Sequence, residues 1–165
     1  MKIKENQKKN IVILHDIRSV ENVGAMFRTA DAAGINKIYL TGYTPTPIDR
    51  FGRKRGDLAK SALGAEEFVP WEQKSLPALM RSLKREGFYI IAIEQDKKSV
   101  DYKKLASHKL KARKLAFIVG TEVTGIPKSV LTKCDVIAEI PMQGKKESLN
   151  VSVALGISLF RILNI

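Results

Sequence analysis

The hydrophobic residues of this chain gather in short blocks that alternate with amphipathic stretches. Apolar runs of strand length predict buried strands. These runs lie at residues 11–17, 37–41, 68–71, 88–94, 115–120 and 136–140. Elsewhere apolar residues recur every three or four positions, which predicts helices at 22–34, 58–63, 72–86 and 148–163. Strands that alternate with helices predict an α/β fold, with a mostly parallel sheet and helices on both faces.

The first predicted helix, residues 22–34, places its apolar side chains on one arc. Those side chains are Val23, Met26, Phe27, Ala30 and Ala33. Asn22 is expected to be the N-cap, because a side-chain oxygen there can accept from a free N–H of the first turn. Arg28 lies away from the arc, on the side of Gly24 and Asp31, and the small Gly24 leaves room for a ligand. Without further information, Arg28 is simply a solvent-exposed helical arginine.

A second polar cluster lies where the last strand meets the last helix. Ser148 is expected to cap that helix, and Asn150 follows it in the first turn. The helix is predicted to turn Leu149, Val153, Leu159 and Leu163 inward. Open α/β sheets bind ligands at such strand–loop–helix junctions. On spacing alone, simple capping remains the favoured role for the two polar side chains.

Bulk composition fits one globular domain. The chain has 165 residues, 44% of them apolar, and is interpreted as a single domain over 1–165 with a short basic tail at 1–10. No apolar run approaches the roughly 20 residues of a membrane span, and the N-terminus lacks a signal-peptide core. Neither a membrane partner nor an exported protein is expected, so the predicted location is cytoplasmic.

Candidate redox and metal residues are few. The single cysteine, Cys134, cannot form an internal disulfide and is expected to be partly buried. No Cys/His cluster suggests a metal site, so no metal is expected. His15 and His108 have no acid or nucleophile partner in the sequence and are interpreted as structural or surface residues.

The charge balance favours a polyanionic partner. The formal net charge is +12, from 29 basic and 17 acidic residues, and such an excess promotes phosphate binding through counterion release. A basic, solvated surface is the alternative, and an acidic membrane surface is weaker because no basic amphipathic helix stands out. The basic side chains gather in three clusters, several of them in predicted loops: Arg50, Arg53, Lys54 and Arg55; Lys109, Lys111, Arg113 and Lys114; and Lys145 with Lys146.

Three segments resemble, in order, the three signatures of the SpoU/TrmH-type RNA 2'-O-ribose methyltransferases of the SPOUT superfamily. They are residues 22–30 (NVGAMFRTA), 117–126 (FIVGTEVTGI) and 140–154 (IPMQGKKESLNVSVA). The second differs from the usual Gly-Asn-Glu by having Thr121 between Gly120 and Glu122. The resemblance implies a deep C-terminal trefoil knot from about residue 88 onward, whereas the general rules for connections predict an unknotted sheet.

The same resemblance implies a cofactor and a set of site residues. The implied cofactor is S-adenosylmethionine. The family's cofactor positions match Gly120, Ile140, Met142 and Leu149, and Ile93 is expected to line the same pocket. The implied catalytic set near the reacting ribose is Asn22, Arg28, Glu122, Ser148 and Asn150.

Arg28 and Glu122 have specific implied roles. The family assigns the matching arginine to activation of the ribose 2'-hydroxyl. Because a guanidinium stays protonated in proteins, stabilising the forming alkoxide or gripping the adjacent phosphate is easier to defend than general-base catalysis. Glu122 is expected to orient Arg28, to cap a short helix after Pro127, or to be a solvated loop carboxylate.

The expected partners are RNA, either tRNA or rRNA, and a second copy of the chain. The resemblance is to minimal single-domain members, so RNA contacts are expected from Arg53, Arg55, Lys145 and Lys146, and from a homodimer partner across the last helix. Two alternatives stay open: a non-catalytic RNA-binding module on the same fold, and an α/β enzyme that methylates or binds a small acidic ligand.

Overall fold

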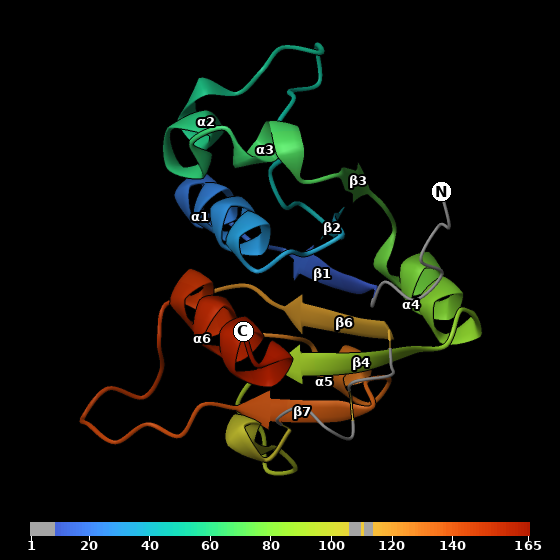
Figure 1. Cartoon of the computed structure of the whole chain (residues 1–165), viewed down its shortest axis with the longest axis vertical. Helices are drawn as coiled ribbons and strands as arrows, with labels where there is room; N and C mark the ends of the chain where they lie inside the picture. Colours follow the sequence, from blue (N-terminus) through green and yellow to red (C-terminus); the bar gives the residue numbers. More distant parts are fainter. Residues whose placement is uncertain (1–8, 106–109, 111–113) are drawn as a thin grey trace, which may run out of the picture.

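The computed structural model describes residues 9–105, 110 and 114–165, so most of the expected basic tail and His108 lie outside the described residues. Within that part, seven strands form one sheet in the order β3-β2-β1-β6-β4-β7-β5 (Figure 1). The strands are β1 (Asn10–His15), β2 (Lys37–Thr41), β3 (Trp71–Gln73), β4 (Phe88–Ile93), β5 (Val100–Asp101), β6 (Lys114–Val119) and β7 (Val136–Glu139). All their pairings are parallel, which confirms the predicted sheet.

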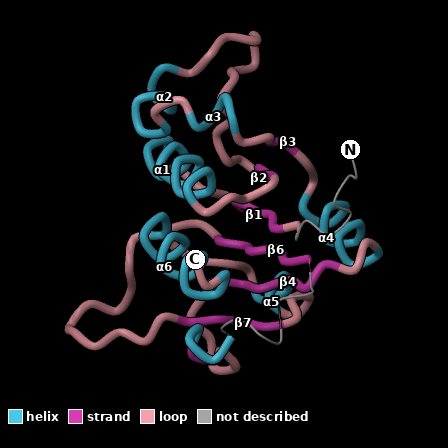
Figure 2. Tube along the Cα trace, in the orientation of Figure 1, coloured by secondary structure: helices cyan, strands magenta, loops and turns pink. Residues whose placement is uncertain are grey.

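Helices cover both faces of this sheet, as predicted (Figure 2). Alternate residues of β1 show why: Val12 and Leu14 belong to one buried cluster, and Ile11 and Ile13 to the other. The first cluster is shared with α1 (Val20–Ala32), α2 (Gly56–Ala62), α3 (Ala65–Phe68) and α6 (Val151–Leu163). The second is shared with α4 (Leu76–Arg85) and α5 (Lys128–Leu131). In the described part, no helix has the length and apolarity needed to cross a bilayer.

Helix α1 buries the predicted arc but begins earlier than expected. The five arc residues are all buried, which confirms the face. The N-cap is Ser19, whose hydroxyl accepts from the Asn22 backbone N–H at 3.1 Å, so the prediction of an Asn22 cap was wrong. Ser19 lies outside the apolar period, which is why the pattern placed the start three residues late. The Asn22 side chain is thereby free for other contacts.

The sequence suggested that Gly24 leaves room for a ligand, but other residues fill the space beside it. A Cβ at this position would lie 2.6 Å from the carbonyl oxygen of Leu58 and would collide with the Ser61 hydroxyl. The glycine therefore allows α1 and α2 to approach closely. Helix packing, which no single-helix pattern reveals, decides its role.

The region 64–76 was predicted least well. A strand was expected at 68–71, but α3 ends at Phe68 and the strand β3 begins at Trp71. The following helix starts at Leu76 rather than 72, with Pro77 in its first turn, where a missing N–H costs nothing. The short β5 and the 3-10 turn η1 (Tyr102–Leu105) were missed, whereas a short helix after Pro127 is present as α5. Elements of two to four residues carry too little periodicity to detect.

The last helix, α6, is capped by Asn150 and not by Ser148. The Asn150 side-chain oxygen accepts from the Ser152 N–H at 2.9 Å. Its buried stripe consists of Leu155, Ser158, Leu159 and Ile162. Val153 is 47% exposed and Leu149 37%, so the predicted inward face was only partly right. Because α6 is apolar almost all round, hydrophobic periodicity could not select its buried face.

Candidate functional site

A cleft of about 540 Å³ opens at the carboxyl ends of β4, β6 and β7, beside the start of α6. The volume lies within the usual range of small-molecule sites. All five predicted cofactor positions line it: Ile93, Gly120, Ile140, Met142 and Leu149. Of the predicted catalytic residues, Glu122, Ser148 and Asn150 line it as well, whereas Asn22 and Arg28 do not. Five of these eight lining residues come from the β7–α6 connection, which forms one side of the cleft.

The charge inside the cleft is opposite to that of the protein as a whole. The charged residues that line it are all glutamates: Glu94, Glu122, Glu139 and Glu147. No group of three or more His, Cys, Asp or Glu side chains suited to a metal ion occurs among the described residues. Such a cleft attracts a cationic organic ligand and repels a phosphate-bearing one.

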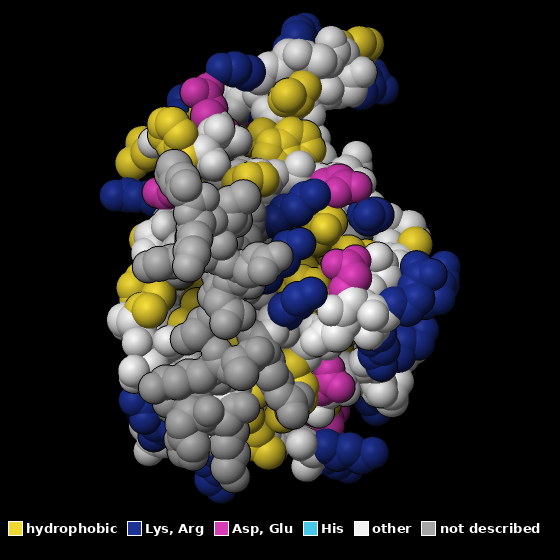
Figure 3. All heavy atoms as spheres, turned by 45° about the vertical axis from the view of Figure 1, so that its right-hand side comes forward, with side chains coloured by type: hydrophobic (Ala, Val, Ile, Leu, Met, Phe, Trp, Pro, Cys, Tyr) yellow, Lys and Arg dark blue, Asp and Glu magenta, His cyan; other side chains and the backbone are white. Residues whose placement is uncertain are grey.

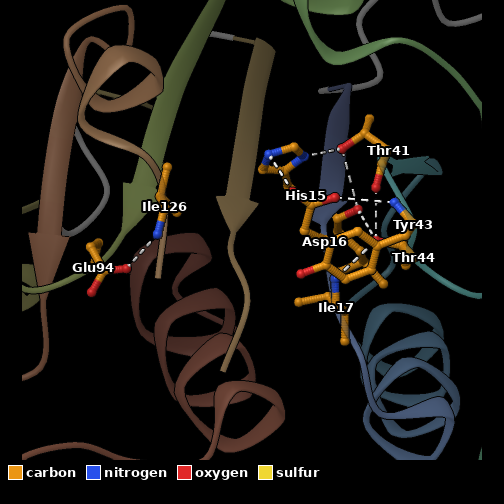
Figure 4. A network of polar contacts seen from close by, with 9 residues as sticks. His15, Asp16, Ile17, Thr41, Tyr43, Thr44, Glu94 and Ile126 are labelled. Atoms are coloured by element: carbon orange, nitrogen blue, oxygen red, sulfur yellow. Dashed lines mark hydrogen bonds and ion pairs between the residues drawn. The ribbon is translucent and has the colours of Figure 1, made fainter. Parts of the chain in front are cut away.

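The turn between β6 and α5 forms one wall of the cleft. The Gly125 N–H donates to the Thr121 carbonyl at 2.9 Å. Figure 4 shows the next contact, in which the Ile126 N–H donates to Glu94 Oε2 at 2.9 Å. Gly125 has φ +67°, and a Cβ there would collide with the Glu94 carboxylate, so glycine is required. Glu94 thus holds the turn against the end of β4. Sequence reasoning missed this residue, because no local pattern links it to residue 126.

The hydroxyl of Thr121 is a buried polar group left without a partner. Its residue is 8% exposed and lines the cleft, and Oγ1 makes no hydrogen bond to any described residue. Unsatisfied buried hydroxyls are rare and call for an explanation. A ligand in the cleft that accepts or donates a hydrogen bond at this point would supply one.

A continuous polar chain joins the three signature segments beside the cleft. Asn22 Nδ2 donates to Glu122 Oε1 at 3.0 Å, and Asn150 Nδ2 donates to Asn22 Oδ1 at 3.1 Å. Asn150 Oδ1 in turn accepts from the hydroxyl of Ser152 at 2.6 Å. Three segments from distant parts of the sequence are therefore held in one arrangement. The hydroxyl of Ser152 therefore belongs to this polar chain.

Glu122 joins that polar chain to the backbone just before α1. It also accepts from the backbone N–H groups of Arg18 and Ser19, both at 3.2 Å. Burial raises the pKa of its carboxyl, but the hydrogen bonds from Asn22 and from backbone N–H groups outweigh burial, so the pKa lies below its usual value. Glu122 is not the cap of α5, because the N-cap is Pro127 and the hydrogen bonds of Glu122 go to Arg18, Ser19 and Asn22. Its contacts fix the start of α1 beside the loop that follows β6.

Arg28 lies apart from the cleft. It is exposed on α1, six residues beyond Asn22 and so about 9 Å further along the helix axis. No contact with Glu122 is formed, so the expected orientation of Arg28 by that carboxylate does not occur in this structure. The next residue, Thr29, lies against Gly156 of α6, where a Cβ would be 3.4 Å from Thr29 Cγ2.

A second network closes the carboxyl end of β1 (Figure 4). His15 Nδ1 lies 2.9 Å from Thr41 Oγ1, and its Nε2 is 3.3 Å from Asp16 Oδ2. Burial lowers the pKa of His15 despite the opposing charge of Asp16, which fits the expected structural role.

Nearby, a hydrogen bond to Tyr43 raises the pKa of Arg18. Arg18 is an exposed cation beside the polar chain that no sequence signal distinguished.

The predicted RNA-contact residues differ in whether their charged groups are paired with carboxylates. Arg53 Nε is paired with Asp49 at 2.9 Å, and Arg55 is bidentate to Asp57 at 3.1 and 2.7 Å. Lys145 and Lys146 are exposed in the β7–α6 connection, whose residues 147–150 line the cleft. The two lysines are therefore available to an anionic partner, and the two arginines are pre-oriented by their carboxylates.

Comparison with known proteins finds relatives among RNA methyltransferases. Residues 9–160 match the SpoU rRNA Methylase family. The chain is 34% identical over 151 residues to the 23S rRNA (guanosine-2'-O-)-methyltransferase RlmB of Escherichia coli, covering 91% of this chain and 58% of the relative. It thus spans less than two thirds of the curated relatives it matches.

Solved structures with a similar fold include RNA-modifying enzymes. The AdoMet-bound rRNA methyltransferase from Sinorhizobium meliloti superposes with a TM-score of 0.84 at 28% identity, covering 95% of this chain and 57% of that one. The TrmH/SpoU tRNA modifying enzyme from A. aeolicus superposes with a TM-score of 0.77 at 27% identity, covering 96% and 75%. The fold is thus similar to that of an rRNA methyltransferase and to that of a tRNA modifying enzyme.

Proposed function

The chain belongs to the SpoU rRNA Methylase family, and from that premise we propose that it transfers a methyl group from S-adenosylmethionine to a ribose 2'-hydroxyl of RNA. One observation carries the proposal. Asn22, Glu122 and Asn150, each from a different signature segment, form one hydrogen-bonded chain at the rim of a ligand-sized cleft. Enzyme catalysis requires such prior positioning of groups around the reacting atoms.

The cleft suits S-adenosylmethionine on three grounds. Its glutamates favour a ligand with a positively charged sulfonium and ammonium. The unpartnered Thr121 hydroxyl offers a hydrogen bond to a polar ligand group. The apolar side chains of Ile93, Ile140 and Leu149 offer surface for a planar base. When bound, the cofactor supplies an electrophilic methyl group on sulfur.

The residues of this chain then have distinct tasks. Glu122, with its lowered pKa, holds Asn22 and the start of α1 in place and is a poor proton acceptor. Asn22 and Asn150 orient the incoming ribose, and the exposed Ser148 at the cleft mouth offers a further hydroxyl contact. Arg28, which lies outside the cleft, binds the phosphate beside the ribose. The hydroxyl proton leaves to water or to that phosphate.

The RNA is tRNA or rRNA, and we propose that the working unit is a homodimer. Support comes from an unpartnered apolar stripe on α6, formed by Val153, Ile157 and Phe160, which are 47%, 38% and 40% exposed. Their spacing of four and three places them on one face of the helix, and such a face fits the self-complementary contact of a two-fold dimer. Ile157→Glu is expected to give a monomer in analytical ultracentrifugation, whereas Arg81→Glu on α4 keeps the dimer.

The C-terminal trefoil knot and a cytoplasmic location are parts of the same proposal. The knot is supported by the position of β7 beside β4 and by the return of the chain to α6, which packs against α1. The cytoplasm is where a tRNA or rRNA substrate and the methyl donor are both present.

The experiment is methyl transfer from labelled S-adenosylmethionine to total tRNA and, separately, to rRNA that lacks the modification. Wild type is compared with Arg28→Ala and with a matched control, Arg81→Ala, on the opposite face of the sheet. Label in one pool, mapped to a ribose 2'-oxygen, lost in Arg28→Ala and kept in Arg81→Ala, is the expected result. Full activity of Arg28→Lys would exclude a specific guanidinium role.

Other outcomes separate the alternatives. RNA binding without cofactor binding would favour a non-catalytic RNA-binding module. Cofactor binding with transfer to a small acidic acceptor and none to RNA would favour the small-ligand enzyme. Cofactor binding without any transfer would contradict the proposal for both RNA pools.

A further inference from the structure

The segment between β2 and α2 projects from the top of the molecule and ends in an ordered turn (Figure 1). An antiparallel bridge joins Ile48 to Lys54, and the Asp49 N–H donates to the Arg53 carbonyl at 2.8 Å. Asp49 Oδ1 accepts from the N–H groups of Phe51 and Arg53 at 2.8 and 3.0 Å. The tip at 49–53 is therefore held in one conformation by the Asp49 carboxylate.

This tip presents an aromatic ring to solvent with two guanidinium groups close to it. Phe51 is 66% exposed. The Arg50 and Arg53 guanidinium carbons lie 4.7 and 5.1 Å from the centre of its ring. Figure 3 shows Lys and Arg side chains together with hydrophobic ones at this end of the molecule. An exposed ring with cations on it is the combination that binds unpaired nucleotides, by stacking and by charge.

The two arginines are not equivalent. Arg53 is paired with Asp49, Lys54 with Glu67 and Arg55 with Asp57. Among the described residues, these ion pairs leave Arg50 without a carboxylate partner. Its guanidinium is therefore free to leave the ring and bind a phosphate when a base takes its place.

We propose that residues 49–53 form a stacking platform for an unpaired base of the RNA, with Phe51 as the stacking surface and Arg50 as a phosphate ligand. The proposal rests on the proposed function, because it takes RNA as the substrate. Residues 49–55 carry four basic side chains against one acidic one, which favours RNA over a protein partner. A base within a duplex is already stacked, so the platform selects single-stranded loops.

The test is fluorescence anisotropy with a labelled oligoadenylate and with the same strand in a duplex, in the absence of S-adenosylmethionine. Phe51→Ala is expected to weaken single-strand binding about 5- to 150-fold and to leave duplex binding unchanged. Phe51→Trp keeps the affinity, and Phe51→Leu loses it, because stacking requires an aromatic face. The matched control is Phe68→Ala, since Phe68 is also an exposed phenylalanine at 75% but lies outside the tip.

The salt dependence separates the two residues of the platform. Arg50→Ala is expected to reduce the slope of log affinity against log salt by about 0.7, one phosphate contact on a single strand, whereas Phe51→Ala keeps the slope. Equal single-strand affinity of wild type and Phe51→Ala, or of wild type and Phe51→Leu, would overturn the platform and leave the proposed function standing.

Two further outcomes also count against it. A change of sedimentation coefficient in Phe51→Ala with unchanged RNA affinity would assign the tip to a protein interface. Failure of wild type to bind any of total tRNA, rRNA and oligoadenylate would overturn both the platform and the proposed function. Because Phe51 is exposed, its variants are expected to keep the thermal stability of wild type, which circular dichroism verifies.

Discussion

Asn22 and Asn150 are 128 residues apart in the chain, yet the side-chain amide of Asn150 donates to that of Asn22 at 3.1 Å. The side-chain amide of Asn22 in turn donates to Glu122 Oε1 at 3.0 Å. The first and last signature segments are thus joined through a single asparagine. The hydrogen bond also links the N-terminal part of α1 to the cap of α6, the two helices that pack together over the same face of the sheet.

This relationship predicts that Asn22→Ala and Asn150→Ala are not additive. Asn150→Ala removes a helix cap and is expected to lower the free energy of unfolding by about 0.5–2 kcal/mol. The double-mutant cycle, measured by urea denaturation, is expected to give a coupling energy of about 0.5 kcal/mol or more. Strict additivity would show that the contact contributes nothing in solution. Asn36→Ala with Asn150→Ala, a distant pair, is the additive control.

The lowered pKa of Glu122 predicts a pH-dependent contribution to stability. Because the carboxylate is favoured in the folded state, its contribution is fully present above the ordinary pKa of 4.5 and is lost as pH falls through the lower folded value. The stability difference between wild type and Glu122→Gln is therefore expected to be constant near neutral pH and to shrink below pH 4.5. Thermal unfolding over a pH series measures it. A difference that grew in acid would contradict the hydrogen-bonded geometry.

Thr121→Val is expected to separate stability from ligand binding. The variant removes a buried, unpartnered hydroxyl, so the ligand-free protein should gain about 1 kcal/mol in free energy of unfolding. Affinity for S-adenosylmethionine, measured by calorimetry, should fall about 2- to 10-fold if that hydroxyl contacts the ligand. Thr124→Val, at an exposed position of the same turn, should give no gain in stability. Unchanged affinity in Thr121→Val would remove the hydroxyl from the ligand site.

Gly24→Ala is expected to destabilise the contact between α1 and α2. The added Cβ would meet the Leu58 carbonyl oxygen at 2.6 Å, a backbone atom that cannot rotate away. Overpacking of this kind costs about 1–3 kcal/mol, measurable by chemical denaturation. Gly56→Ala is the matched control, because a Cβ there meets nothing within 4 Å. Equal stability of the two variants would show that the helices separate easily.

Cys134 is expected to be a slow-reacting thiol. Burial raises its pKa to about 11, with the Asp135 carboxylate adding to the effect. At pH 8 the thiolate is therefore a small minority, and only the thiolate is nucleophilic. Reaction with a disulfide reagent should be slow in the native protein and rapid in denaturant. Rapid reaction at pH 8 without unfolding would contradict the partly buried position.

The sequence predicted the long elements well and the short ones poorly. The strands near 88–94, 115–120 and 136–140 were placed within a residue or two, because a buried parallel strand is continuously apolar. The start of α1 and the cap of α6 were missed, because capping depends on local backbone geometry and not on hydrophobic period. The buried face of α6 was missed because its surface is apolar nearly all round.

By itself, the sequence determined the α/β class, the single cysteine, the basic charge and the three signature segments that identify the family. These follow from composition and from short stretches of chain. Only the tertiary structure decided that Asn22 bonds Glu122 rather than capping its helix, that Glu94 supports the turn at Gly125, and that Arg28 stands outside the cleft. Those relations join residues tens of positions or more apart, and side-chain contacts at such separations arise only when the sheet brings its strand ends together.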